Sequence, residues 1–181
     1  MSVALVTGAY KGLGLAWCAR LAAEGHEVIL TARSKTKAAA FRLDALDAGV
    51  MGEVLRVNSL APLLAVKHFR PWLRRAERPL VLSVSSWLGS VSQLSFGGHY
   101  GYVGSKNLLN VLHRSMAFEL RDEGIICVTV NPGWVRTDMG GSRAELSPEA
   151  AVDRLMAGVV HRVTLADTGR FLDHDGTDHP W

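Results

Sequence analysis

The sequence predicts an α/β fold in which parallel strands alternate with helices. Short runs rich in Val, Ile and Leu alternate along the chain with longer amphipathic segments, which is the pattern of a parallel sheet with helical crossovers. Glycine-containing turns separate many of these segments. The length of 181 residues suits one core. We therefore expect a single domain over residues 1–181.

The elements follow in order from their boundary signals. Gly25 closes the first helix, while Ser147 and Pro148 suit the cap and first position of the last one. Pro62 and Pro71 bend the third helix or mark its ends. We expect strands at 3–7, 27–31, 79–84, 125–130 and 171–173, and helices at 13–24, 35–48, 52–74, 102–123 and 147–160.

Composition narrows the class of protein. Hydrophobic residues make up 48% and charged residues 20% of the chain, an ordinary globular balance. No uninterrupted apolar run approaches the roughly 20 residues of a membrane helix, and the chain enters its first strand without a secretory signal. Cys18 and Cys127 lie in apolar segments, which favours buried, reduced thiols. We expect a cytoplasmic protein with no membrane partner.

The net charge of +3 raises the question of nucleic-acid binding. The basic residues are scattered, and the densest cluster, from Arg70 to Arg78, lies at the end of an expected helix. Positive charge there complements the helix dipole, whereas nucleic-acid binding calls for a basic stripe on one face. We expect no nucleic-acid partner.

A glycine-rich turn joins the first strand to the first helix. The run from Thr7 to Gly14 places glycines at Gly8, Gly12 and Gly14. Such a turn bends sharply and lets its backbone approach a phosphate, while the following helix directs its N–H groups at the anion. This arrangement is typical of Rossmann-like, doubly wound dinucleotide-binding folds. The alternative is an ordinary strand-to-helix turn.

The residues after the second strand bear on the choice of dinucleotide. A carboxylate there favours NAD, because it accepts hydrogen bonds from the adenosine ribose. This chain has Arg33 instead, and Lys11 adds a positive charge in the glycine turn. Both favour the 2′-phosphate of NADP(H) over NAD(H), unless Arg33 is simply a solvated loop residue.

A tyrosine and a lysine open the long helix at 102–123. Tyr102 and Lys106 are four residues apart and share a helix face. A neighbouring ammonium group lowers the pKa of a phenol and makes it a usable acid–base group. Ser85 and Ser86 end an expected strand, where ligand sites of parallel α/β sheets lie. Each feature alone is also common in helices and turns without any function.

Together these stretches resemble the short-chain dehydrogenase/reductase family, and within it the small NADPH-dependent carbonyl reductases of the C-factor or sniffer kind. The matching segments run from end to end in the family's order. They are residues 7–14, 57–59, 84–90, 102–106, 131–137 and 169–176, with Pro180 and Trp181.

The resemblance implies roles for matching residues. Tyr102 would be the proton donor or acceptor, Lys106 would lower its pKa and hold the nicotinamide ribose, Ser86 would hold the substrate oxygen, and Asn58 would help hold a relay water. Ser85 is the less favoured serine. The cofactor would be contacted by Gly8, Lys11, Gly12, Leu13, Gly14, Arg33, Pro132, Gly133, Val135 and Thr137. The segment 138–146 resembles a substrate-covering loop.

The resemblance also reveals a missing piece. The family places a further strand, helix and strand before the helix that carries Asn58, including an Asp at adenine and an Asn-Ala-Gly turn, and this chain has neither. The shortfall corresponds to about one strand–helix–strand unit. Because unpaired buried backbone is costly, we expect the shortened sheet to close up, with the strand at 79–84 shifting beside the first strand. The alternatives are that another chain fills the gap or that the domain is loosely folded.

The sequence therefore predicts an NADPH-dependent oxidoreductase that acts on a carbonyl or alcohol substrate. The alternative is a catalytically impaired homologue that acts as a nucleotide-binding or protein-interaction module. The resemblance implies a homodimer or homotetramer. Asp173, His174, Asp175, Asp178 and His179 lack the spacing of a dedicated metal site, so we expect no metal.

Overall fold

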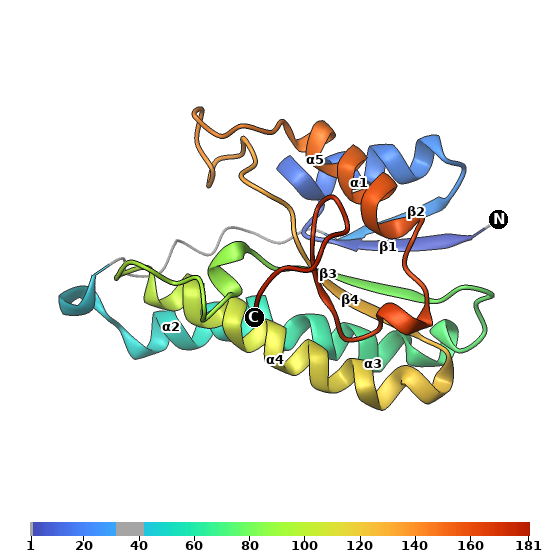
Figure 1. Cartoon of the computed structure of the whole chain (residues 1–181), viewed down its shortest axis with the longest axis horizontal. Coiled ribbons are helices and arrows are strands. Elements are labelled where there is room, and N and C mark those ends of the chain that lie inside the picture. The colour runs from blue at the N-terminus through green and yellow to red at the C-terminus, as the bar shows by residue number, and fades with distance from the viewer. Residues whose placement is uncertain (1, 32–41) are drawn as a thin grey trace. The chain divides into compact units, whose positions relative to one another are not determined.

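The computed structural model describes residues 2–31 and 42–181, with elements labelled in Figure 1. These residues fall into two compact units. The first comprises residues 2–31, 132–162 and 174–176, and the second comprises 42–131, 163–173 and 177–181. The expectation of one domain over residues 1–181 stays a prediction.

The first unit is built on a two-stranded parallel sheet. Strand β1 (Val3–Thr7) pairs with β2 (Glu27–Thr31) along its whole length. Helix α1 (Gly12–Ala23) joins them and packs on both strands, and Gly25 reverses the chain after it at φ +83°. Helix α5 (Pro148–Leu155) packs against α1 and runs on as a π-helical turn, Met156–Val160. The Ser147 side chain caps α5 by accepting from Ala150 N, as expected.

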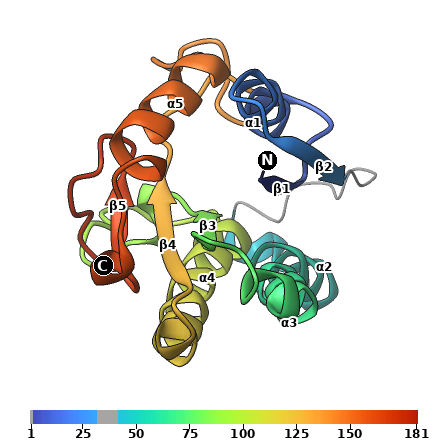
Figure 2. The same cartoon turned by 90° about the vertical axis from the view of Figure 1, so that its right-hand side faces the viewer.

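The second unit contains a three-stranded parallel sheet in the order β3-β4-β5. Its strands are β3 (Leu80–Val84), β4 (Ile126–Asn131) and β5 (Phe171–Asp173). All six residues of the central strand β4 are buried. Helix α4 (Tyr100–Leu120) packs along β4, as Figure 2 shows, and continues as a 3₁₀ turn to Glu123. A core cluster joins Ala117 and Leu120 to Ile125 and Cys127.

The α/β class with parallel strands is confirmed: each unit contains one parallel sheet. Strand β3 pairs with β4 over its full length, from Leu80 opposite Ile126 to Val84 opposite Val130. The expectation that the shortened sheet closes up, with β3 beside β1, stays a prediction.

A long helix leads into the second unit's sheet. Helix α2 (Ala48–Leu55), a π-helical turn (Arg56–Leu60) and α3 (Ala61–Leu73) follow without a break. Asp47 begins the helix, because its side chain accepts a hydrogen bond from Val50 N at 2.7 Å. Pro62 lies in the first turn of α3 and Pro71 inside it. The expected helix at 35–48 is therefore wrong over 42–47, where a 3₁₀ turn (Leu43–Ala45) precedes the cap, and 35–41 lie outside the described residues.

This helix is also unusually apolar for an exposed element. It spans Ala48–Leu73, has a stretch of mean hydropathy 1.3, and only 6% of that stretch is buried. By length and composition this helix could cross a membrane. It was not identified from the sequence, because charged and polar residues interrupt its apolar run. The same two properties describe a helix that packs against another protein surface, so they do not by themselves identify a membrane span.

Cys18 and Cys127 are buried and form no disulfide, as expected. Burial raises the pKa of the Cys127 thiol to about 12. Because the thiolate is the reactive form, this side chain is chemically inert near neutral pH.

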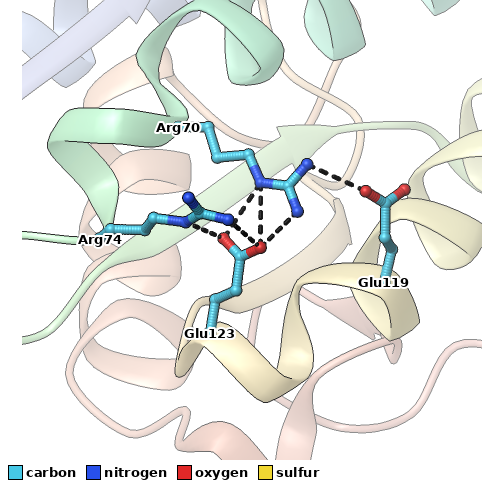
Figure 3. A network of polar contacts seen from close by, with 4 residues as sticks. All are labelled: Arg70, Arg74, Glu119 and Glu123. Carbon is cyan, nitrogen blue, oxygen red and sulfur yellow. Dashed lines mark hydrogen bonds and ion pairs between the residues drawn. The ribbon is translucent and has the colours of Figure 1, made fainter.

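An ionic cluster ties α3 to the end of α4 (Figure 3). The Arg70 guanidinium donates to Glu119 at 3.0 Å and to both oxygens of Glu123, and Arg74 donates to Glu123 at 2.6 and 2.7 Å. Hydrogen bonds from Arg74 and then Arg70 hold the pKa of the Glu123 carboxyl well below its usual range. Part of the basic cluster noted in the sequence is thus paired within the chain.

We expect Glu123→Gln to lower the melting temperature by a few degrees at pH 7, because both guanidinium groups lose their shared charged acceptor. The folded-state pKa of Glu123 is depressed, so its contribution is complete above the unfolded pKa of about 4.3 and declines as pH falls below it. Thermal unfolding of both proteins at several pH values measures this. The exposed Glu77→Gln is the matched control, and an equal effect of the two substitutions would contradict the assignment.

His113 in α4 is buried, and neither ring nitrogen has a hydrogen-bond partner in the described structure. Burial lowers its pKa to about 4. The unfolded chain therefore binds a proton that the folded chain does not, and stability falls as pH drops below about 6.5.

We expect His113→Leu to remove this acid sensitivity. Relative to the parent, its free energy of unfolding should improve by about 2 kcal/mol between pH 7 and pH 5. Urea unfolding at both pH values tests this, with the exposed His68→Leu as control. An identical pH dependence of the parent and the His113 variant would overturn the prediction.

Candidate functional site

The structure brings Ser86, Tyr102 and Lys106 together in the second unit. Ser86 follows the carboxyl end of β3 in extended conformation and caps a 3₁₀ turn, Trp87–Gly89, by accepting from Leu88 N at 3.2 Å. Tyr102 lies in the first turn of α4 and hydrogen-bonds the Ser86 side chain. The Lys106 Nζ lies 5.7 Å from the centroid of the Tyr102 ring. A serine hydroxyl, a phenol and an ammonium group therefore converge.

The electrostatics of the pair are set by burial. The Lys106 Nζ donates to the carbonyl oxygen of Val84 at 2.8 Å, and desolvation lowers the Lys106 pKa to about 8. Desolvation also raises the pKa of Tyr102 above its usual value, and the hydrogen bond with Ser86 acts in the opposite direction. The neighbouring ammonium group was expected to lower the Tyr102 pKa, whereas in this structure burial of the phenol raises it and the opposing contribution comes from Ser86.

Asn58 reaches this group through a π-helical turn, a geometry that is rare and frequent at functional sites. Its Nδ2 donates to Ser105 Oγ at 3.1 Å, and Ser105 Oγ donates to the carbonyl oxygen of Tyr102 at 2.7 Å. The adjacent Ser59, fully buried, donates to the carbonyl oxygen of Ser105 at 2.7 Å. Sequence reasoning identified Asn58 by resemblance only and missed Ser59 and Ser105.

Three asparagines hold the loop that carries Ser86. Asn107 Nδ2 donates to Leu88 O at 3.2 Å, Asn110 Nδ2 to Gly89 O at 3.0 Å, and Asn131 Oδ1 accepts from Trp87 N at 3.0 Å. None of them was singled out in the sequence, although the spacing of Asn107 and Asn110 places both on one helix face.

The two serines after β3 have different surroundings. Ser85 Oγ is buried without a hydrogen-bond partner in the described structure, and a Cβ at Gly89 would come within 2.8 Å of it. Ser86 instead contacts Tyr102. This difference follows from the alternation of side chains along an extended chain. It favours Ser86 over Ser85 as the serine that acts together with Tyr102.

The glycine turn belongs to the first unit and has the expected geometry. Gly8 and Gly12 adopt the left-handed region at φ +70° and +55°. A Cβ on Gly14 would lie 2.5 Å from the carbonyl oxygen of Gly8. No side chain caps α1 at Lys11, so the first N–H groups of this 12-residue helix are left for a ligand. A glycine-lined helix end of this kind fits the pyrophosphate of a dinucleotide.

The expected cofactor residues after β4 lie in the same unit as the glycine turn. Thr137 Cγ2 is 3.2 Å from the Cβ position of Gly12, and Lys11 forms an ion pair with Asp138. Pro132 precedes Gly133, which turns the chain at φ +78°. Val135 and Leu146 form a core cluster on which Leu13 packs. Leu13 and Val135 thus contribute packing, whereas Lys11, Gly12 and Thr137 lie next to one another. Arg33 falls outside the described residues.

The acidic and histidine residues near the end of the chain form pairs rather than a ligand set. His179 Nδ1 lies 2.9 Å from Asp173 Oδ2, and Asp178 pairs with Arg170 at 2.8 Å. No group of three His, Cys, Asp or Glu residues that could hold a metal ion occurs in residues 2–31 and 42–181.

The first unit also has an open groove of about 520 Å³ between α1 and α5. Leu15, Ala16 and Val152 line it with Arg20 and Asp153. Of the expected site residues only Gly12 reaches it. Because none of the proton-transfer residues lines this groove, the chemistry points to the Ser86–Tyr102–Lys106 group instead.

Comparison with known proteins agrees with this geometry. The short chain dehydrogenase family profile matches residues 2–48 and 40–147. The C-signal protein of Myxococcus xanthus is 39% identical over 136 residues, covering 75% of this chain and 81% of that protein. An uncharacterized oxidoreductase of Schizosaccharomyces pombe is 31% identical over 142 residues, covering 70% of this chain but only 56% of that protein. The chain thus spans little more than half the length of the Schizosaccharomyces pombe protein.

Solved structures show the same fold. An NADPH-bound carbonyl reductase from chicken fatty liver superposes with a TM-score of 0.88 at 25% identity, covering 100% of this chain and 94% of that one. The carbonyl reductase Sniffer of D. melanogaster superposes with a TM-score of 0.87 at 23% identity, covering 99% of each chain. The family profile matches in two segments rather than one, which agrees with an internal shortening.

We expect Gly14→Ala to destabilise the protein by about 1–3 kcal/mol, because the new methyl group collides with the Gly8 carbonyl oxygen and the backbone must shift. The same substitution at Gly52, whose Cβ position is open within helix α2, should instead stabilise by roughly 1 kcal/mol. Urea unfolding of the two variants gives both values. Equal and small effects would show that the turn is not as tight as described.

Proposed function

This chain belongs to the short-chain dehydrogenase family of NAD(P)-dependent oxidoreductases, and we propose that it transfers hydride between NADP(H) and a carbonyl or alcohol substrate. The observation that carries the proposal is the convergence of Ser86, Tyr102 and Lys106, all largely removed from solvent, at the carboxyl end of β3. Bound NADPH would supply the hydride, and the remaining chemistry is proton transfer by the chain's own side chains.

Tyr102 is the proposed acid–base group. Its hydroxyl would give a proton to the substrate oxygen in reduction and take it back in oxidation. The Ser86 hydroxyl, already hydrogen-bonded to Tyr102, would hold the same oxygen. With a pKa of about 8, Lys106 is mostly protonated at pH 7 and would stabilise the phenolate that remains.

Asn58 is the proposed positioning group for a water in the proton path. Its amide is linked through Ser105 to the first turn of α4, which carries Tyr102. A proton leaving Tyr102 needs a route to solvent because the phenol is buried. The π-helical turn supports this role because it brings a polar side chain of one helix to the helix that carries the tyrosine.

NADP(H) is the proposed cofactor, with NAD(H) less favoured. Gly8, Gly12 and Gly14 would receive the pyrophosphate at the uncapped end of α1. Lys11 and Arg33 would contact the 2′-phosphate, and Pro132, Gly133, Val135 and Thr137 would lie at the nicotinamide with Leu13 supporting the turn. The NADPH-bound state of the chicken carbonyl reductase supports this assignment.

We further propose a cytoplasmic homodimer or homotetramer. The long helix Ala48–Leu73 leaves Leu60, Leu64, Phe69 and Trp72 exposed, and α4 leaves Phe118 exposed. A second copy that covers these side chains would remove a large apolar surface from water. Sedimentation of the purified protein measures its oligomeric state directly.

A second candidate function is a catalytically impaired homologue that binds nucleotide or a partner protein. The match of the family profile in two segments favours it, because this match agrees with the loss of an internal piece of the fold. A cofactor is oriented well only where rigid elements support its site.

We expect Tyr102→Phe to lower turnover by a factor of about 10² to 10⁴ while NADPH still binds, because only the transferable proton is removed. NADPH oxidation with a panel of aldehydes and ketones measures turnover, and fluorescence titration measures NADPH and NADH affinity. Tyr100→Phe, in the same helical turn, is the matched control and should keep both properties.

The outcomes separate the two functions. Saturable NADPH binding with turnover that requires Tyr102 supports the oxidoreductase. Binding without turnover in the parent protein supports the impaired homologue. No binding of either nucleotide to a folded protein overturns the cofactor assignment altogether.

A further inference from the structure

We propose that the C-terminal residues Asp173, His179 and Trp181 are positioning residues that hold the loop carrying Ser86 in its working geometry. The proposal deepens the proposed function and rests on it for the chemical role of Ser86. The loop in question is Ser85–Ser92, which we call the serine loop. All the contacts involved lie within the second unit.

The first contact fixes the peptide group next to Ser86. Ser85 N donates to Val130 O at 2.8 Å, and Trp87 N donates to Asn131 Oδ1 at 3.0 Å. Ser86 therefore lies between two anchored backbone groups. The second anchor depends on which way the Asn131 amide faces, because only its oxygen can accept from an N–H.

Asp173 decides that orientation. Its Oδ1 accepts from Asn131 Nδ2 at 2.7 Å. A carboxylate is an acceptor only, so it holds the NH₂ end of the amide and turns the Asn131 oxygen toward Trp87. Without the carboxylate the amide could rotate and present hydrogens to the Trp87 N–H, and the anchor would be lost.

His179 holds Asp173 from the other side. Its Nδ1 lies 2.9 Å from Asp173 Oδ2, which requires the hydrogen on Nδ1. The ring is only 7% exposed and packs at 4.6 Å on Phe171, and the His179 N–H donates to Phe171 O at 2.8 Å. The carboxylate thus has a partner on each oxygen, and both partners come from buried side chains.

Trp181 holds the far end of the same loop. Its main-chain oxygen accepts from Ser92 N at 3.1 Å and from Ser92 Oγ at 2.6 Å. The indole is fixed by the Arg114 guanidinium, 4.7 Å from the ring centroid, and by Phe171 at 5.5 Å. The short segment 173–181 therefore fixes the serine loop at both ends. This constraint sets the direction in which the Ser86 hydroxyl points.

The test compares Asp173→Ala with Asp178→Ala. Asp178 belongs to the same segment but pairs with Arg170 outside this set of contacts. The first readout is the hydrogen-exchange rate of the Trp87 amide, measured by NMR. The others are kcat and KM for the reduction of an aldehyde, and the affinity of the protein for NADPH. We expect Asp173→Ala to speed Trp87 exchange and to lower kcat by about tenfold or more each, because a charge-assisted contact is lost.

The control and the rescue make the role specific. NADPH affinity should stay within about twofold, since one buried contact far from the glycine turn in sequence is removed. Asp178→Ala should leave the Trp87 exchange and kcat unchanged. Asp173→Asn keeps an oxygen that can accept from Asn131. It should therefore restore most of the parent's kcat and most of the protection of the Trp87 amide from exchange. Exchange of the Leu109 amide in α4 reports general destabilisation and should not follow the Trp87 rate.

Equal Trp87 exchange in the two alanine variants overturns the proposal, as does a parallel rise at Leu109. If the parent protein turns over no aldehyde yet Asp173→Ala still frees the Trp87 amide, the positioning role stands and the proposed oxidoreductase function fails. If the parent protein turns over an aldehyde and Asp173→Ala does not change Trp87 exchange, the oxidoreductase function stands and the positioning role fails.

Discussion

The parallel pairing of β3 with β4 is the interaction on which the candidate site depends. It aligns Val84 with Val130, so the two strands end at the same edge of the sheet. Ser86 leaves one strand there and Asn131 ends the other, within one hydrogen bond of the Trp87 amide. Because β4 is buried along its whole length, this register cannot slip without exposing a face of the core. Ser86 and the Val84 carbonyl oxygen that accepts from Lys106 both lie at that edge.

Helix α4 adds the proposed acid–base pair to this edge. Tyr102 and Lys106 arrive on successive turns of α4, and the carbonyl oxygen of Val84 receives the Lys106 ammonium group. The same environment that holds these side chains also removes them from water, which shifts both pKa values toward the neutral forms. Orientation and electrostatics therefore have one common cause, the burial of the first turns of α4 against β3 and β4.

The glycine turn is a separate piece of structure with its own constraint. Gly14 approaches the Gly8 carbonyl oxygen so closely that no side chain fits, and Gly12 holds a left-handed backbone beside Thr137. The strand that leads into it, β1, pairs only with β2 in the described residues. Shortening of the chain has thus preserved the local geometry of both functional groups.

The sequence by itself determined the parts of this protein that depend on local spacing. The turn from Thr7 to Gly14, the shared helix face of Tyr102 and Lys106 and the Ser147 cap follow from backbone sterics and helix periodicity, and the structure agrees with each. The tertiary structure decided what depends on contacts between distant segments. Only packing brings the Ser86 side chain to Tyr102 and joins Asn58 to Ser105. The links from Trp87 through Asn131 to Asp173 also lie beyond sequence reasoning, because hydrogen bonds between residues more than 40 positions apart leave no periodic signal in the chain.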